Sequence, residues 1–132
     1  MGRRAVILLD THAWLWWAGD HSKLPPRLRR RLGAERALAI SAVSCWEAAM
    51  LIQRGRLELA PDARTGIRDA CAIPNLRVVP VTESIAMEAG LLEDFHGDPA
   101  DRIIVATALE LRARLATRDE RIRASKQVES IW

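Results

Sequence analysis

Short apolar runs alternate along the chain with longer amphipathic stretches. The clearest run covers residues 5–9, an unbroken aliphatic sequence, AVILL, that stops abruptly at Asp10. Continuous hydrophobicity without alternation is typical of a strand that is covered on both faces, as in a parallel sheet. Weaker patterns of the same kind predict strands at 38–41, 76–81, 115–117 and 128–132.

Helix signals fill the segments between these strands. Thr82 and the pair Asp98 and Pro99 are typical of helix N-termini, whereas Gly19 and Gly55 are typical of residues that follow a helix. Together with the hydrophobic periodicity, these signals predict helices at 11–18, 25–33, 44–53, 62–71, 82–92, 99–112 and 120–124.

Strand and helix segments therefore alternate over the whole chain, which predicts an α/β three-layer sandwich. A mostly parallel sheet of four to five strands would carry helices on both faces, joined by right-handed crossovers. The length of 132 residues suits one domain that buries a full core without disulfides or structural metal. We therefore expect residues 1–132 to form a single domain.

The composition narrows the class of protein. With 49% hydrophobic and 28% charged residues, the chain has the balance of a soluble globular protein, and its apolar runs are too short to cross a bilayer. Asp10 and His12 interrupt the N-terminal apolar stretch, and no small-residue cleavage pattern follows, so we expect no signal peptide, no membrane partner and a cytoplasmic location. Cys45 and Cys71 lack the spacing of a zinc site and are interpreted as buried free thiols.

Charge and aromatic content indicate nucleic-acid binding only weakly. The formal net charge is +3, from 20 Lys and Arg against 17 Asp and Glu. The arginines within residues 27–31 are interpreted as a solvated helix face, with contact to RNA phosphates or to a protein partner as the alternative. We interpret four tryptophans as core or interface residues rather than as surfaces on which bases stack. These are Trp14, Trp16, Trp17 and Trp46.

Acidic residues gather at the predicted ends of strands and starts of helices. Asp10 follows the first strand directly, and Asp119 comes two residues after the fourth. Glu47 lies in the first turn of a predicted helix, and Asp98 and Asp101 occupy the cap and first turn of another. Since the carboxyl ends of parallel strands meet at one edge of the sheet, we expect these five side chains to converge there.

Such a convergence would require a cation, because carboxylates a few ångströms apart cannot all ionise cheaply. With only oxygen donors at these positions, Mg²⁺ or Mn²⁺ is the expected ion rather than Zn²⁺ or copper. Ions of this kind bind phosphate oxygens and lower the pKa of bound water. The predicted chemistry is therefore hydrolysis of a phosphodiester.

A purely structural interpretation exists for most of these acids. Ser44 and Glu47 have the spacing of a capping box, and Asp98 and Asp119 each precede a predicted helix as an N-cap would. Asp10 resists this interpretation, since a carboxylate at the end of a buried apolar strand is costly without a partner.

Four motifs in order along the chain then point to a family. They read ILLDTHAWLWW, SAVSCWE, HGDPADRIIVATA and LATRDERI, and from Val6 to the C-terminus the chain resembles VapC-type PIN domains. In that family the matching acids form the metal site, which implies catalytic and metal-binding roles for Asp10, Glu47, Asp101 and Asp119. The resemblance also implies supporting roles for Asp98, Thr117 and Thr11. Ala100 stands where the family often has an aromatic residue, a change that removes no ligand.

The resemblance implies an activity and partners as well. VapC-type PIN domains are cytosolic, Mg²⁺- or Mn²⁺-dependent endoribonucleases that inhibit growth as toxins. They form homodimers, sometimes within larger assemblies, and a cognate VapB-type antitoxin neutralises them. We therefore expect an RNA substrate, an antitoxin partner and a homodimer for this chain.

Two other functions are weighed against this one. An α/β phosphatase or phosphoacceptor domain would need a second acid close to the first, whereas Thr11 and His12 follow Asp10. A non-catalytic binding subunit of a regulatory complex would use the same carboxylates only as helix caps. Metal binding that depends on Asp10 would separate this second alternative from the nuclease.

Overall fold

The computed structural model describes residues 6–95 and 97–132; Ala5 of the predicted first strand and His96 of the third motif lie outside them. Within this part of the chain the strands are β1 (Ile7–Leu9), β2 (Leu38–Ser41), β3 (Leu76–Val79), β4 (Arg114–Ala116) and β5 (Ser130–Ile131). The helices are α1 (Thr11–Ala18), α2 (Pro26–Ala34), α3 (Ala42–Gln53), α4 (Ala63–Cys71), α5 (Glu83–Leu91), α6 (Pro99–Leu111) and α7 (Glu120–Ala124), with a 3-10 turn η1 (His21–Lys23). None of these described helices is both long and apolar enough to cross a membrane.

All strands belong to one sheet in the order β3-β2-β1-β4-β5, and every neighbouring pair is parallel. The aliphatic run of β1 lies at the centre, where Leu8 pairs with Ala39 of β2 and with Leu115 of β4. Its three residues are completely buried, as an unbroken apolar strand requires. The predicted α/β fold is confirmed, with five strands that are all parallel.

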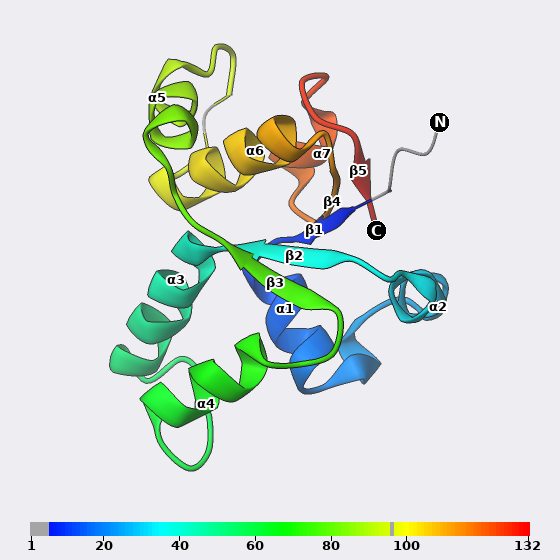
Figure 1. The fold of residues 1–132 in the computed structure, drawn as a ribbon, viewed down its shortest axis with the longest axis vertical. Coiled ribbons are helices and arrows are strands. Elements are labelled where there is room, and N and C mark those ends of the chain that lie inside the picture. Colours follow the sequence, from blue (N-terminus) through cyan, green and yellow to red (C-terminus); the bar gives the residue numbers. More distant parts are fainter. Residues whose placement is uncertain (1–5, 96) are drawn as a thin grey trace.

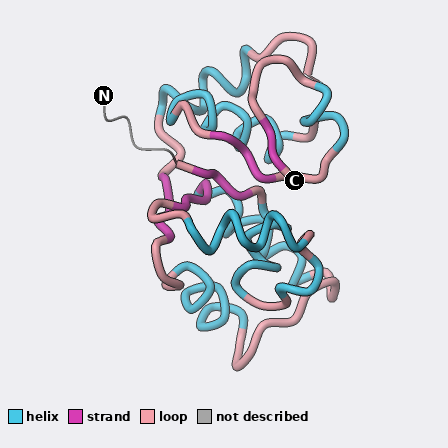
Figure 2. The backbone as a smooth tube through the Cα atoms, turned by 90° about the vertical axis from the view of Figure 1, so that its right-hand side faces the viewer, coloured by secondary structure: helices cyan, strands magenta, loops and turns pink. Residues whose placement is uncertain are grey.

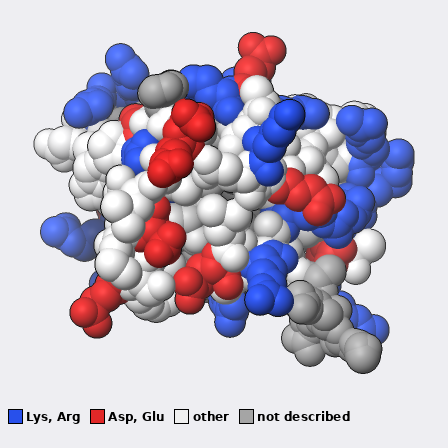
Figure 3. All heavy atoms as spheres, turned by 90° about the horizontal axis from the view of Figure 1, so that it is seen from above, with Lys and Arg blue, Asp and Glu red and all other residues white. Residues whose placement is uncertain are grey.

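Alternating side chains of the sheet build two cores, one on each face. Leu8, Ala39 and Leu115 pack with apolar residues of α5, α6 and α7. Ile7 and Leu9 point to the opposite core, which α1, α2 and α4 cover. Figures 1 and 2 show the resulting three layers, with the sheet between the two groups of helices. Acidic and basic side chains are interspersed on the face seen from above, so the small positive charge is not gathered there in one patch (Figure 3).

Most helix boundaries agree with the sequence patterns, but the start of α3 does not. The helix begins at Ala42, directly after β2, and Ser41 is its N-cap, with the side chain accepting a hydrogen bond from the N–H of Val43. The predicted capping box of Ser44 and Glu47 is therefore wrong. Ser44 is instead buried inside the helix, and Glu47 lies beyond the first turn.

The tryptophans and cysteines differ in their surroundings. Trp14 is fully buried, and its indole N–H donates to the carbonyl of Ala70 at 2.9 Å, which confirms packing as its role. Trp46 is 52% exposed and does not belong to the core of this chain. Cys45 and Cys71 are free thiols as predicted, but they are only half-buried, with their Sγ atoms 3.6 Å apart.

Candidate active site

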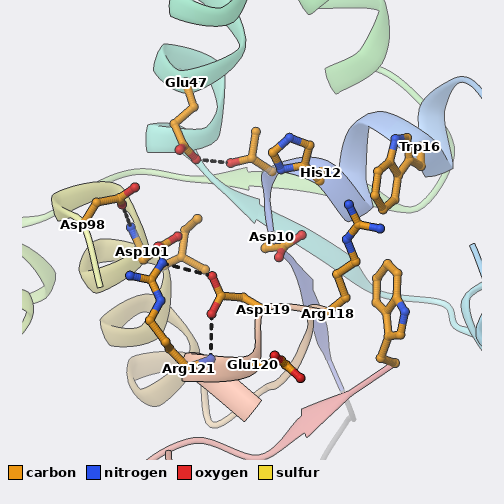
Figure 4. Close-up of a pocket in the computed structure, with 13 residues that line it drawn as sticks. Asp10, His12, Trp16, Glu47, Asp98, Asp101, Arg118, Asp119, Glu120 and Arg121 are labelled. Atoms are coloured by element: carbon orange, nitrogen blue, oxygen red, sulfur yellow. Dashed lines mark hydrogen bonds and ion pairs between the residues drawn. The ribbon is translucent and has the colours of Figure 1, made fainter. Parts of the chain in front are cut away.

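A cleft of about 540 Å³ opens at the carboxyl edge of the sheet. It is lined by every acidic residue that the sequence patterns selected, namely Asp10, Glu47, Asp98, Asp101 and Asp119. They come from four separate segments: the end of β1, the middle of α3, the start of α6 and the loop between β4 and α7. Figure 4 shows them around the cleft. The predicted convergence is therefore present in the structure.

Asp10 lies at the centre of this edge because it follows the central strand. It is the N-cap of α1, and its carboxylate accepts a hydrogen bond from the N–H of Ala13 at 2.9 Å. Burial raises the pKa of Asp10 above its ordinary value, although hydrogen bonds from Thr117 and Ala13 act in the opposite direction. A second acid, Asp119, contributes to the increase by its charge. Asp10 thus holds its negative charge at a cost.

Glu47 is held by a small network of hydroxyl groups. The Thr11 hydroxyl is hydrogen-bonded to the carboxylate of Glu47 and lies 2.8 Å from the hydroxyl oxygen of Ser44. Since an ionised carboxylate only accepts, Thr11 donates to Glu47 and can accept from Ser44. Burial raises the pKa of Glu47, and the Thr11 hydrogen bond partly offsets this increase.

Asp98 and Asp101 enter the cleft together at the start of α6. Asp98 is the N-cap, and its Oδ1 accepts from the N–H of Asp101 at 2.8 Å. Burial, followed by the charges of Asp98 and Asp119, raises the pKa of Asp101 to about 7. A carboxyl group that holds its proton near neutral pH is typical of a functional site.

Asp119 differs from the other acids because it already has a cationic partner. Arg121 places its guanidinium 3.3 Å from Asp119 and 3.4 Å from Asp101. Partial burial raises the pKa of Asp119, but hydrogen bonds from Arg121 and from the N–H of Ile122 outweigh it, so the net shift is downward. The buried Thr117 hydroxyl accepts from the N–H of Asp119 at 3.0 Å and so fixes the loop.

The donor set fits a hard divalent cation. Several carboxylate groups line the cleft, and carboxylate oxygens are ligands that Mg²⁺ and Mn²⁺ prefer. Burial, and after it the charges of neighbouring acids, raise the pKa of Asp10, Glu47 and Asp101, and a bound cation would offset both effects. In residues 6–95 and 97–132, however, no three acidic, His or Cys side chains are arranged to hold one ion. Arg121 and Thr11 engage three of the acids instead, namely Asp101, Asp119 and Glu47.

Comparison with known proteins places the chain in a family. The model of the PIN domain matches residues 7–126. The chain belongs to the PIN-domain family. Ribonuclease VapC22 of Mycobacterium tuberculosis is 35% identical to this PIN domain over 130 residues, which cover 96% of this chain and 98% of that protein. The resemblance to VapC-type PIN domains is therefore confirmed.

Solved structures show the same fold at lower sequence identity. VapBC2 from Rickettsia felis, bound to a DNA fragment from their promoter, contains a chain with a TM-score of 0.73 and 14% identity, covering 96% of this chain and 98% of that one. DNA-bound VapBC from Salmonella typhimurium gives a TM-score of 0.69 at 18% identity, over 96% and 97% of the two chains. At these identities the comparison shows that the fold of this PIN domain is shared.

Sequence patterns missed several residues that surround the acids. His12, Trp16, Arg118, Arg121 and Trp132 also line the cleft. The sequence did not single out Arg118 and Arg121, because their position at the cleft depends on contacts with distant segments. Trp16 lies in the first motif, six residues after Asp10, but the sequence does not show which way its side chain faces.

Arg102 stabilises the segment of this PIN domain that precedes α6. Its guanidinium donates to the carbonyl oxygens at the end of α5 and in the following loop, which belong to Ala89, Gly90, Leu92 and Phe95 at 2.6–3.2 Å. These carbonyls include groups that no further helical turn satisfies. Arg102 therefore connects the loop that leads to Asp98 with the first turn of α6.

Proposed function

We propose that this PIN domain is a single-domain endoribonuclease that depends on Mg²⁺ or Mn²⁺. It acts in the cytoplasm as a growth-inhibiting toxin, forms a homodimer, and is neutralised by a VapB-type antitoxin. The relative at 35% identity is named a ribonuclease, and several structural neighbours are toxin-antitoxin complexes. Both findings support the proposal.

One observation carries the catalytic part of the proposal. Asp10, Asp98 and Asp119 each cap a helix, so helix stability alone could explain them. Glu47 and Asp101 cap nothing, yet they line the same cleft and have raised pKa values. A cleft that gathers carboxylates beyond those needed for capping favours a metal-dependent enzyme over a binding subunit.

The roles of the residues follow from their positions. Asp10, Glu47, Asp101 and Asp119 would hold the metal, and Asp98 would support the site from the N-cap of α6. Thr11 and Thr117 orient Glu47 and the Asp119 loop through their hydroxyl groups. A bound divalent cation would supply charge neutralisation and activation of water for attack on the phosphodiester. The Arg121 guanidinium contacts the Oδ2 atoms of Asp101 and Asp119, so a bound ion would compete with it for these two oxygens.

Asp10→Asn tests the proposal directly. We expect the variant to keep its fold, to lose saturable Mn²⁺ binding in calorimetry, and to cleave RNA more than about 100-fold more slowly, since even outer-shell partners of metal ligands contribute about 10–100-fold. Asp62→Asn is the matched control, because Asp62 is an exposed N-cap of α4 and Asn also caps well.

The result that would overturn the proposal is full RNA cleavage by Asp10→Asn. The toxin function is tested by induced expression of the wild-type chain with and without the product of a short neighbouring reading frame. Growth arrest that requires Asp10 and is relieved by this product is expected. Sequencing of RNA ends during the arrest would identify the cleaved RNA.

A further inference from the structure

One wall of the cleft is aromatic and basic rather than acidic. The ring of Trp16 lies 5.7 Å from that of His12 and 6.0 Å from that of Trp132, both tilted, and the Arg118 guanidinium stands over its face at 4.8 Å. Figure 4 shows Trp16 and Arg118 beside Asp10, on the side of the cleft away from Asp98. We call Trp16, Trp132, His12 and Arg118 the aromatic wall.

The aromatic wall continues into a second cavity of about 350 Å³. Trp132 lines both cavities, and its backbone carbonyl accepts two hydrogen bonds from the Arg27 guanidinium, at 3.0 and 3.3 Å. The second cavity also contains Arg31 and Arg123. Arg31 forms an ion pair with Glu35 at 3.9 Å, a kind of contact that contributes little energy when the arginine is exposed to solvent. A path therefore leads from the carboxylates over two indole rings to a cluster of arginines.

We propose that the aromatic wall and the adjoining arginines form a binding subsite for single-stranded RNA. A base stacks on Trp16 or Trp132, Arg118 leaves the ring to contact a phosphate, and the next phosphate lies among Arg27, Arg31 and Arg123. This inference rests on the proposed ribonuclease function and names the residues that would position its substrate.

The physical case starts from the charge of the substrate. An acidic cleft repels a polyanion, so an RNA strand needs cationic and stacking contacts nearby to bind in register with the carboxylates. Bases of single strands stack on aromatic rings and on guanidinium planes, and both kinds of surface are present in the aromatic wall. Trp16 and Trp132 are only half-buried, unlike the fully buried Trp14, so packing alone does not account for them.

The test measures RNA affinity without cleavage. Wild-type chain and variants are titrated into a fluorescein-labelled eight-nucleotide RNA in EDTA, and anisotropy gives the dissociation constant. We expect Trp16→Leu and Trp132→Ala each to weaken binding about tenfold, the loss that follows from removing one stacked base. Trp16→Phe, which keeps an aromatic face, should retain most of the affinity. Trp46→Ala is the matched control, since Trp46 is 52% exposed but does not line the cleft.

Two further arms identify the kind of contact. An abasic oligonucleotide of the same length should bind the wild-type chain and Trp16→Leu equally, because it keeps the sugar–phosphate backbone but has no base to stack on a ring. Arg118→Gln should weaken binding to all sequences and reduce the salt dependence by about one charge. Arg30→Gln is its control, an exposed arginine of α2 outside both cavities.

Wild-type RNA affinity in both tryptophan variants would overturn the inference. The inference would also fail if these variants lost as much affinity for the abasic oligonucleotide as for RNA. Loss of antitoxin binding with unchanged RNA binding would assign the aromatic wall to the protein partner and also overturn it. Should Trp16→Leu fail to fold, Trp132→Ala carries the test alone. Because binding is measured in EDTA, these outcomes do not depend on whether the wild-type chain cleaves RNA with Mn²⁺.

Discussion

The carboxyl groups of the cleft differ because each has a different local environment. Asp119 has an arginine partner and a lowered pKa, whereas Asp10, Glu47 and Asp101 are desolvated and have raised values. A ligand that requires the ionised form must therefore compete with protons at these three acids, and at Asp101 the competition extends to about pH 7. Metal binding is therefore coupled to the loss of protons from these carboxyl groups.

This coupling predicts how Mn²⁺ affinity depends on pH. Because the pKa of Asp101 is raised to about 7, affinity should increase as pH rises through about 7 and level off above it. Asp101→Asn should bind Mn²⁺ more weakly and lose this inflection. Calorimetric titrations at a series of pH values measure both effects. An affinity that stays constant from about pH 6 to pH 8 in the wild-type chain would contradict the role given to Asp101.

The hydroxyl network around Glu47 gives a second prediction at this scale. Thr11→Val keeps the size of the side chain but removes the donor to Glu47, so the carboxylate loses orientation and its pKa rises further. We expect RNA cleavage to decrease by about 10–100-fold, as for other partners of metal ligands. Thr107→Val is the matched control, since within the described residues the buried Thr107 hydroxyl donates only to the Ile103 carbonyl of its own helix. Equal activity in the two variants would refute the role of Thr11.

At the scale of elements, α6 positions two acids, and Arg102 fixes the segment before it. Arg102→Met would leave up to four carbonyl oxygens without their donor, so we expect the free energy of unfolding to fall by about 2–3 kcal/mol. Mn²⁺ affinity should decrease too, because Asp98 follows the released loop. Thermal melts and calorimetry measure the two effects, with the exposed Arg54→Met as control. If Arg102→Met were as stable as this control, hydration of the released carbonyl oxygens would compensate fully for the lost hydrogen bonds, and the structural role of Arg102 would be refuted.

Elements were largely predictable from sequence because their signals are local. The N-caps Asp62, Thr82 and Asp98 each stand at the predicted boundary, and each side chain accepts a backbone N–H. The start of α3 was misplaced because two serines in SAVS both fit a cap, and only the parallel pairing of Ser41 with Val79 shows where β2 ends. Local patterns do not contain that information.

The site was predictable in outline for a different reason. The carboxyl ends of parallel strands lie at one edge of the sheet. The topology alone therefore brings Asp10 and Asp119 to this edge, independently of their side-chain contacts. The individual contacts were not predictable, since Thr11 and Glu47 are 36 residues apart and Arg121 reaches back to α6. Such contacts depend on how helices pack on the sheet, which hydrophobic periodicity does not specify.

For the whole molecule, the carboxylate cleft is a source of instability in the absence of metal. Between the ordinary pKa of 3.8 and the folded value of about 7, Asp101 binds a proton in the folded state that the unfolded chain has released. The folded state thus binds more protons in this window, so its stability falls as pH rises. Asp10 and Glu47 act in the same direction because their pKa values are also raised.

The melting temperature of the metal-free chain should therefore decrease from about pH 5 to pH 8, and Mn²⁺ should restore it most at the higher pH, where the carboxylates are ionised. Asp101→Asn removes one of the groups responsible, so this variant should melt higher than wild type at pH 8 without metal and gain less from Mn²⁺. Calorimetric scans with and without Mn²⁺ at both pH values measure these shifts. A wild-type chain that is more stable at pH 8 than at pH 5 without metal would show that burial and mutual repulsion do not raise the pKa values of these acids in the folded state, and the electrostatic reason for a cation would be lost.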